Sequence, residues 1–294
     1  MATGNAERAR FAAKGLSPPA PWRVGPREWD FSVPLVMGVI NVTPDSFSDG
    51  GCCLEPEKAL ERALELVDEG ADIIDIGGAS SHPSAPPVDP ATELERVAPV
   101  VERIGRYISL PLSIDTVNPG VAEECLRLGA HLINDVSGLN SLDMAEVATR
   151  YGVPLVITHN GWALPPRPSD QRLMDAIYAF FRQRIAQVEE LQVQHVIVDP
   201  GYGFGKTLQE NLTLLRSLNG LVRLQKPILI CTSRKGSLGR IAGEPDPRQR
   251  LGATLATSMF AAFQGAAMIR VHDVKPFRQA QMAWRAIKSA PREI

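Results

Sequence analysis

Polar side chains recur along this chain at the ends of short apolar segments, where a β-strand would give way to a loop. They are Asn41, Asp115, Asn134, His159, Asp199, Lys235, Arg270 and His272. A single residue of this kind is commonly the cap of the following helix, and we accept that interpretation for Asp135, Asn140 and Asp273. Capping does not require an Asn or Asp inside the last apolar turn of strand after strand. The set as a whole therefore indicates a functional site.

The side chains of this set fall into two chemical groups. The first supplies carboxylates and an amide, from Asp115, Asn134 and Asp199. Such groups suit a flat heterocycle that is rich in N–H donors. The second supplies positive charge and several donors, from Lys235, Arg270 and His272. These groups suit a phosphate or a carboxylate.

Residues 35–51 join a buried strand to a polar loop. The apolar run from Leu35 to Val42 is typical of a strand that is buried on both faces. The segment after it has the short polar side chains and paired glycines of a turn, so by itself the stretch reads as a strand and a solvated turn. Next to the other strand ends, however, Asn41 and the loop oxygens could hold hydrated Mg²⁺, which usually takes few protein ligands plus substrate phosphates.

Eight strand–helix pairs must position these side chains. The predicted strands cover residues 35–42, 72–76, 112–114, 131–133, 155–158, 195–198, 228–231 and 267–271. The predicted helices cover residues 56–69, 91–106, 119–128, 142–151, 170–192, 210–218, 247–264 and 276–288. Apolar strands that alternate with helices indicate a parallel sheet with right-handed crossovers.

This α/β pattern predicts a single (β/α)8 TIM barrel over residues 31–294, in which the strand ends converge on one face. A doubly wound open sheet is the alternative. Residues 1–30 contain Pro18, Pro19, Pro21 and Pro26 and show no periodicity. We predict that they form a short N-terminal extension, flexible or extended.

Composition argues against several classes of protein. Of 294 residues, 44% are hydrophobic, and 31 Lys and Arg against 33 Asp and Glu give a formal net charge of −2. We therefore expect no nucleic-acid partner. We expect no membrane association, because no apolar run approaches the ~18 residues of a membrane span. The N-terminal segment has no uninterrupted apolar region, so we do not expect it to be a secretory signal. Four cysteines without metal-binding spacing lead us to expect a cytoplasmic location.

Seven segments carry the strand ends and the loops that follow them. They are INVTPDSFSDGG at 40–51, GADIIDIGG at 70–78, SIDT at 113–116, INDVSG at 133–138, DPGYGFGKT at 199–207, TSRK at 232–235 and RVHDV at 270–274. In this order they resemble the dihydropteroate synthase family. That family joins 6-hydroxymethyl-7,8-dihydropterin pyrophosphate to p-aminobenzoate in folate biosynthesis and releases pyrophosphate. The resemblance implies a pterin-binding transferase with small-molecule substrates and Mg²⁺ as cofactor.

The resemblance also implies roles for individual residues. The pterin ring would be held by Asp115, Asn134, Asp199 and Lys235. The pyrophosphate and Mg²⁺ would be held by Asn41, Arg270 and His272. The catalytic residues would be Asp115, Lys235, Arg270 and His272. Further substrate contacts would come from Thr43, Asp45, Phe47, Ser81, His82, Pro83, Phe204 and Ser237, and the loops 43–51 and 79–87 would close over the site.

Departures from the family pattern are concentrated on the p-aminobenzoate side. Residues 79–84 read Ala-Ser-Ser-His-Pro-Ser, where the family usually has Glu-Ser-Thr-Arg-Pro-Gly. Gly236 stands where Ser is usual, and residues 158–160 read Thr-His-Asn in place of Met-His-Met. At His82, a group with a pKa of about 6.5 replaces a permanently charged Arg. If a charged His82 organises the closed loop, closure should weaken above neutral pH.

These departures leave other functions open. One is a paralogue that binds pterin without synthase activity. A pterin methyltransferase on the same barrel is another, disfavoured because TSRK and RVHDV suit an anionic leaving group. No Ser/His/Asp or Cys/His signature indicates a covalent nucleophile.

The C-terminal helices carry apolar residues on more than one stripe, at 251–263 and 279–287. One contact with the barrel does not require so much apolar surface. We therefore predict a homodimer through this region. The alternative is that the small residues only pack these helices tightly on the barrel.

Overall fold

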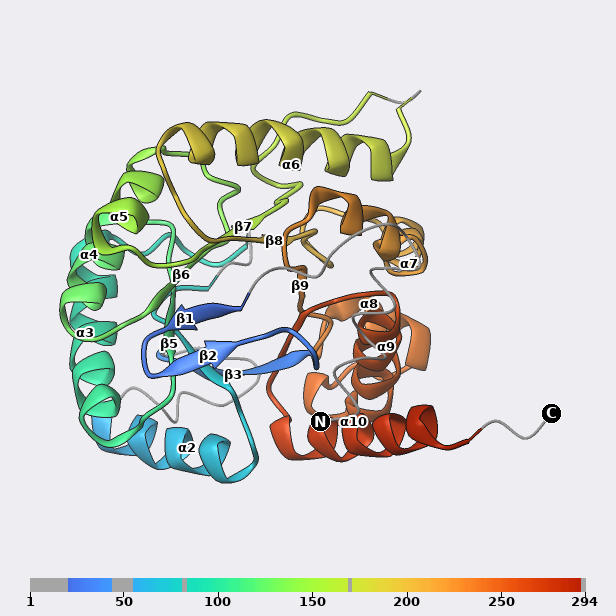
Figure 1. Cartoon of the computed structure of the whole chain (residues 1–294), viewed down its shortest axis with the longest axis horizontal. Helices are drawn as coiled ribbons and strands as arrows, with labels where there is room; N and C mark the ends of the chain where they lie inside the picture. Colours follow the sequence, from blue (N-terminus) through green and yellow to red (C-terminus); the bar gives the residue numbers. More distant parts are fainter. Residues whose placement is uncertain (1–20, 44–54, 81–83, 169–170, 292–294) are drawn as a thin grey trace.

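Eight short parallel strands form the centre of the computed structural model, which describes residues 21–43, 55–80, 84–168 and 171–291 (Figure 1). They are β3 (Leu35–Asn41), β4 (Ile73–Gly77), β5 (Leu112–Asp115), β6 (Leu132–Asp135), β7 (Leu155–Thr158), β8 (Val196–Asp199), β9 (Leu229–Ile230) and β10 (Met268–Val271). Their order in the sheet is β8-β7-β6-β5-β4-β3-β10-β9. A parallel bridge between Val198 and Ile228 joins the two ends of this order. The predicted barrel is confirmed, and the open sheet is excluded.

Helices surround the barrel (Figure 1). They are α2 (Pro56–Asp68), α3 (Pro90–Tyr107), α4 (Pro119–Arg127), α5 (Asp143–Tyr151), α6 (Leu173–Glu190), α7 (Leu208–Arg216), η1 (Leu218–Leu224), α8 (Gly236–Ala242), η2 (Pro247–Gln249), α9 (Leu251–Phe263) and α10 (Val274–Ser289). Four of them begin with proline, whose missing N–H has no helical partner to lose at that position. At α7, Thr207 and Glu210 form a capping box. No described helix combines the length and the apolarity that crossing a lipid bilayer requires.

An antiparallel hairpin, β1 (Trp22–Val24) with β2 (Arg27–Trp29), lies against one end of the barrel (blue in Figure 1). Its apolar side chains pack on residues that lie early in the barrel strands, at the end opposite the predicted site. The hairpin and its neighbours bury Trp22, Val24, Trp29, Phe31, Met37, Ile73, Leu132, Val156, Ile197, Leu229 and Met268. The sequence analysis did not predict this hairpin, because two three-residue strands are too short to show a period. Contact with the barrel is what stabilises it.

The helices near β9 also differ from the prediction. The predicted helix 247–264 is divided into η2 and α9. Asp246 accepts a hydrogen bond from the N–H of Arg248 and so caps η2 as a separate turn. The additional helix α8, which is absent from the predicted helices, begins directly after Lys235.

Candidate active site

The polar strand ends meet in one row at one face of the barrel. Asn41 pairs with Gly77, Gly77 with Asp115, and Asp115 with Asn134, across β3, β4, β5 and β6. Side chains two residues apart on a strand point to the same face. Asp75 therefore lies one layer deeper in the barrel than the row that contains Asp115.

Arg270 from β10 connects this deeper layer to the row above it. Its Nε donates to Oδ2 of Asp75 at 2.6 Å, and its Nη2 donates to Oδ2 of Asp115 at 3.0 Å. Its Nη1 lies 3.9 Å from Sγ of Cys231. Asn134 donates from Nδ2 to the same Asp75 oxygen at 3.2 Å. Because a guanidinium has five N–H groups, Arg270 keeps donors for a ligand while both carboxylates hold it in place.

The charges of this cluster are unbalanced. Burial raises the pKa of Asp115 to about 7, and although the Arg270 guanidinium opposes that shift, Asp75 and Glu93 add to it. Burial also acts to lower the pKa of Arg270, but the carboxylates of Asp75 and Asp115 outweigh it and hold the group fully charged. Two carboxylates thus share one guanidinium, and Asp115 is the one whose pKa lies near neutral pH.

Two buried oxygens of the cluster have no hydrogen-bond partner among the described residues. They are Oδ1 of Asp75 and Oδ1 of Asn134. An unsatisfied buried oxygen costs roughly 1–3 kcal/mol, so a ligand that brings N–H groups recovers this energy. The carboxylate of Asp75 fixes the orientation of the Asn134 amide. A carboxylate paired with Arg270 accepts hydrogen bonds, so it must face Nδ2 of Asn134 rather than Oδ1. This arrangement suits the edge of an N–H-rich heterocycle.

Asp199, at the end of β8, anchors the glycine-rich loop. Its Oδ1 accepts a hydrogen bond from the N–H of Gly201 at 2.8 Å, and burial raises its pKa. Gly201 has a φ of +68°, and a Cβ there would lie 2.1 Å from the carbonyl oxygen of His159. Lys206 fastens the loop by donating to the carbonyls of His159, Gly201 and Phe204 at 3.0, 2.9 and 3.2 Å. The loop is therefore tied to the end of β7 at two points.

Lys235 and Phe204 lie side by side at the mouth of the barrel. The Lys235 ammonium is 4.4 Å from the centroid of the Phe204 ring, within the range of a cation–π contact. Lys235 also acts to lower the pKa of Asp199. A cation, an aromatic face and a buried carboxylate are thus grouped on one side of the site.

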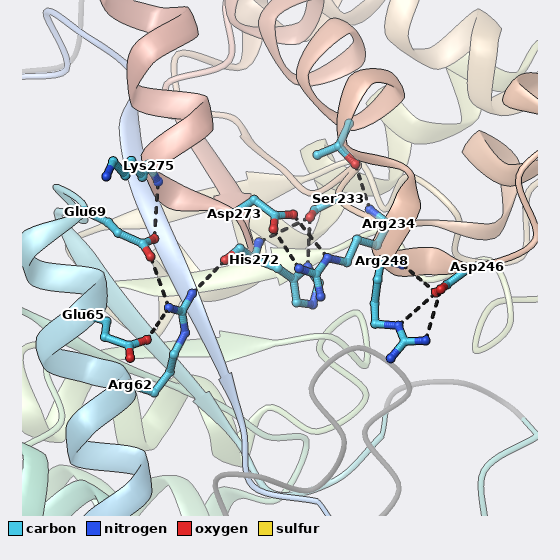
Figure 2. A network of polar contacts seen from close by, with 11 residues as sticks. Arg62, Glu65, Glu69, Ser233, Arg234, Asp246, Arg248, His272, Asp273 and Lys275 are labelled. Atoms are coloured by element: carbon cyan, nitrogen blue, oxygen red, sulfur yellow. Dashed lines mark hydrogen bonds and ion pairs between the residues drawn. The ribbon is translucent and has the colours of Figure 1, made fainter.

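His272 lies just beyond β10 among positively charged residues (Figure 2). Its Nδ1 is 2.9 Å from Oγ of Ser233, and its carbonyl accepts a hydrogen bond from Arg62 of α2 at 3.1 Å. Arg234 is held by Asp273 through Nε and Nη2 at 3.2 and 2.7 Å. Burial, together with the nearby Arg and Lys charges, lowers the pKa of His272 well below its ordinary value. We expected positive charge from His272, whereas its surroundings in the fold favour a neutral imidazole that can form hydrogen bonds.

A cavity of about 560 Å³ opens beside these groups. Lys235, Gly236, Ser237 and Phe204 contribute to its lining. The Ser237 hydroxyl donates to the Tyr202 hydroxyl at 2.8 Å. A cavity of this volume has room for a small molecule next to the strand ends.

Comparisons with known proteins agree with this geometry. The profile of the family described as "Pterin binding enzyme" matches residues 37–272. The dihydropteroate synthase of Bacillus subtilis is 42% identical over 251 residues, which is 84% of this chain and 87% of that protein. The dihydropteroate synthase of Xanthomonas albilineans is 38% identical, and its structure with 4-aminobenzoic acid has a TM-score of 0.84 over 90% of this chain and 97% of that one. Its complex with 7,8-dihydropteroate has a TM-score of 0.81 over the same shares.

The chain belongs to the dihydropteroate synthase family. It is accordingly a pterin-binding transferase of folate biosynthesis.

Most of the residues expected from the dihydropteroate synthase pattern lie around the barrel mouth. Those within the described ranges are Asn41, Thr43, Asp115, Asn134, Asp199, Phe204, Lys235, Ser237, Arg270 and His272. Hydrogen bonds or ring contacts join Arg270 to Asp115 and Lys235 to Phe204. The expected contacts Asp45, Phe47, Ser81, His82 and Pro83 lie outside the described residues.

The sequence analysis missed Asp75, the hub of the cluster. It lies in the strand segment Asp-Ile-Ile-Asp-Ile, and its side chain is 0% exposed. A carboxylate in the middle of a strand that is buried on both faces needs a charged or N–H partner, since burying it alone is very costly. That requirement was a signal in the sequence. Lys206 was also not predicted. Its three partners are backbone carbonyls of loop residues, which no pattern of residue types in the sequence indicates.

Proposed function

We propose that this protein condenses 6-hydroxymethyl-7,8-dihydropterin pyrophosphate with p-aminobenzoate to give 7,8-dihydropteroate and pyrophosphate. The observation that carries the proposal is the Arg270 cluster, in which the unpaired oxygens of Asp75 and Asn134 lie next to a buried cation. A pterin supplies the N–H groups that those oxygens lack. The ligands bound to the X. albilineans relative, an amine substrate and the joined product, support the same reaction.

The reaction forms one bond and breaks one bond at the methylene carbon of the pterin. The amine nitrogen of p-aminobenzoate attacks this carbon, the C–O bond to pyrophosphate breaks, and the nitrogen then loses a proton. Binding both substrates side by side supplies much of the rate acceleration. No covalent enzyme intermediate is needed.

Arg270 and His272 act on the charge that develops as pyrophosphate leaves, whereas Lys235 helps to hold the pterin ring. Donors aimed at a developing anion in a buried site lower the barrier most when the contact strengthens in the transition state. Arg270 contributes a permanent charge, and His272 contributes a hydrogen bond from a neutral ring. Asp115, Asn134 and Asp199 hold the pterin ring through its N–H groups.

Mg²⁺ is part of the proposal, with Asn41 as its ligand. Within the described ranges, no group of three or more His, Cys, Asp or Glu side chains could hold a metal ion. This fits an ion that takes few protein ligands and completes its shell with water and the pyrophosphate of the substrate. Asn41 is half-buried at the end of β3 and offers a carbonyl oxygen. When bound, Mg²⁺ would neutralise charge on the leaving pyrophosphate.

Assay of the purified protein with pterin pyrophosphate, p-aminobenzoate and Mg²⁺ tests the proposal. Formation of 7,8-dihydropteroate in step with pyrophosphate release is the expected result. Binding of the pterin substrate with no product over a long incubation would instead support the non-synthase paralogue. Omitting Mg²⁺ and adding a chelator should reduce turnover strongly.

We also propose a homodimer formed through α9 and α10. Large apolar side chains remain exposed on these helices: Leu251 37%, Phe260 45%, Phe263 52%, Met282 67% and Ile287 76%. Covering them would remove apolar surface from water. Light scattering at micromolar concentration should give twice the chain mass, and Met282→Glu should give a monomer.

We place the protein in the cytoplasm, on the evidence of its thiols. Cys125 and Cys231 are buried and free. Free thiols are typical of a reducing compartment.

A further inference from the structure

We propose that Arg240 binds the carboxylate of the amine substrate and makes the enzyme prefer an acid over a neutral aniline. This inference rests on the proposed function, because that reaction needs a site for an aromatic amine next to the pterin. Arg240 lies on α8, five residues after Lys235, and lines the cavity of about 560 Å³.

The cavity has the chemistry of an aromatic anion site. Among the described residues, its lining includes three basic side chains, Lys206, Lys235 and Arg240, and no Asp or Glu. Burial lowers the pKa of Lys206 to about 7, so Lys235 and Arg240 supply most of the positive charge. Two aromatic rings also line it, Trp162 and Phe204, whose centroids are 5.4 Å apart. An aromatic ring with a negative charge therefore matches both the walls and the charge of the cavity.

Most other polar side chains in the lining have already used their donors within the protein. Lys206 gives its ammonium to three backbone carbonyls. Thr207 donates to Glu210, and the amide of Asn211 donates to the carbonyls of residues 206 and 207. The Ser237 hydroxyl donates to Tyr202. None of these groups can bind a carboxylate without giving up a hydrogen bond that it makes within the protein.

Arg240 differs from them, because its side chain makes no hydrogen bond or ion pair within the part of the chain that the structure describes. The side chain of Lys235 makes none there either, but its ammonium lies over the Phe204 ring, at the end of the cavity next to the barrel. Its guanidinium offers two parallel N–H groups, the geometry that matches a carboxylate. Gly236, on the preceding turn of α8, has no hydroxyl to compete for the same ligand. The chain thus provides a charged donor on the helix where its sequence lacks the usual serine.

Position along α8 agrees with the shape of p-aminobenzoate. The amine and the carboxylate lie at opposite ends of the ring, so the carboxylate must point away from the pterin. Lys235 lies at the barrel end of α8 beside Phe204, whereas Arg240 lies more than one turn further along the helix and is exposed. An amine that attacks at the strand ends therefore directs its carboxylate toward Arg240.

The test compares Arg240→Gln and Arg240→Lys with a matched control, Arg248→Gln. Arg248 is exposed, pairs with Asp246 and is not part of the cavity lining (Figure 2). For each protein, kcat/KM is measured with p-aminobenzoate and with the neutral 4-aminobenzamide at saturating pterin pyrophosphate and Mg²⁺. Arg240→Gln should lower kcat/KM for the acid about 10- to 100-fold, the effect of a lost charge-assisted hydrogen bond. It should leave the neutral amine and the KM for pterin pyrophosphate within twofold, and Arg240→Lys should recover part of the loss.

An unchanged ratio of acid to neutral amine in Arg240→Gln would overturn the inference, as would an equal loss for both amines. Calorimetric titration of p-aminobenzoate in the presence of Mg²⁺ and pyrophosphate gives a second readout that does not depend on turnover. If the unmutated protein makes no product, the proposed function fails, yet a selective loss of p-aminobenzoate affinity in Arg240→Gln still supports the inference. Equal affinity in both proteins rejects it.

Discussion

Arg270 and Asp75 form an ion pair of 2.6 Å across the barrel, with side chains that are 14% and 0% exposed. The Asp75 oxygen in this ion pair, Oδ2, also accepts a hydrogen bond from the side-chain amide of Asn134 at 3.2 Å. One carboxylate therefore sets the orientation of both a cation and an amide. We describe Asp75 as a positioning residue for the two groups.

Asp75→Asn should separate this positioning role from simple charge. The substitution keeps the volume but leaves Arg270 with one fewer anion and lets Asn134 rotate. Because breaking a buried ion pair costs about 3–5 kcal/mol of stability, we expect the thermal midpoint to drop. We expect kcat/KM for pterin pyrophosphate to fall about 100-fold, because Arg270 and Asn134 lose the carboxylate that orients them. Asp72→Asn is the control, since Asp72 lies at the opposite end of the barrel and pairs with Arg278. Unchanged kcat/KM in a folded Asp75→Asn protein would contradict the assigned role.

Arg270→Ala should lose stabilisation of the leaving group. We expect the loss of about 3 kcal/mol of transition-state stabilisation, which is typical for one lost donor to a developing anion. This corresponds to a fall in kcat/KM of roughly 100-fold. Part of the loss should appear in kcat, because the contact strengthens as pyrophosphate departs. Steady-state kinetics of pyrophosphate release provide the measurement. Release near the unmutated rate would refute this role for Arg270.

The raised pKa of Asp115 predicts a pH-dependent stability. The folded-state pKa is about 7 and the ordinary value is 3.8, so between these values the folded protein holds a proton that the unfolded chain has lost. Stability from this group is therefore complete below about pH 4 and is lost as pH rises through 7, with a slope of up to about 1.4 kcal/mol per pH unit.

Asp115→Asn should remove this contribution. Free energies of unfolding from denaturant titration at several pH values between about 4 and 8 provide the measurement. We expect the difference between variant and unmutated protein to shift in favour of the variant as pH rises. A difference that stays constant with pH would contradict the raised pKa.

Two glycine substitutions should have opposite effects. Gly201→Ala would place a Cβ 2.1 Å from the carbonyl oxygen of His159 at a φ of +68°, so the loop must move and take Phe204 with it. We expect loss of stability by more than about 2 kcal/mol and a higher KM for p-aminobenzoate. Gly120→Ala is the control, because a Cβ there meets nothing within 4 Å in the first turn of α4. It should be neutral or stabilising by up to about 1 kcal/mol.

Local patterns in the sequence determined the alternation of strands and helices. Apolar runs, proline at helix starts and glycine at turns act over a few residues, and they placed Asp115, Asn134 and Asp199 at the ends of strands. Parallel strands in a closed barrel bring those ends together, so a site at one face followed from the sequence. The roles of Asn41, Arg270 and His272 in binding pyrophosphate came from resemblance and stay predictions.

Contacts between distant segments decided the rest. Asp75 and Arg270 are 195 residues apart, and nothing local to either strand indicates that they share a hydrogen bond. The neutral state of His272 and the raised pKa of Asp115 depend on burial and on charges from other strands. The donors of Ser237 and Lys206 are used by neighbours that only the folded chain supplies, which leaves Arg240 and Lys235 as the cations that can meet a ligand in the described part of the cavity lining. The sequence determines the type of each side chain, but the partners that set its charge and its hydrogen bonds come from packing across the barrel.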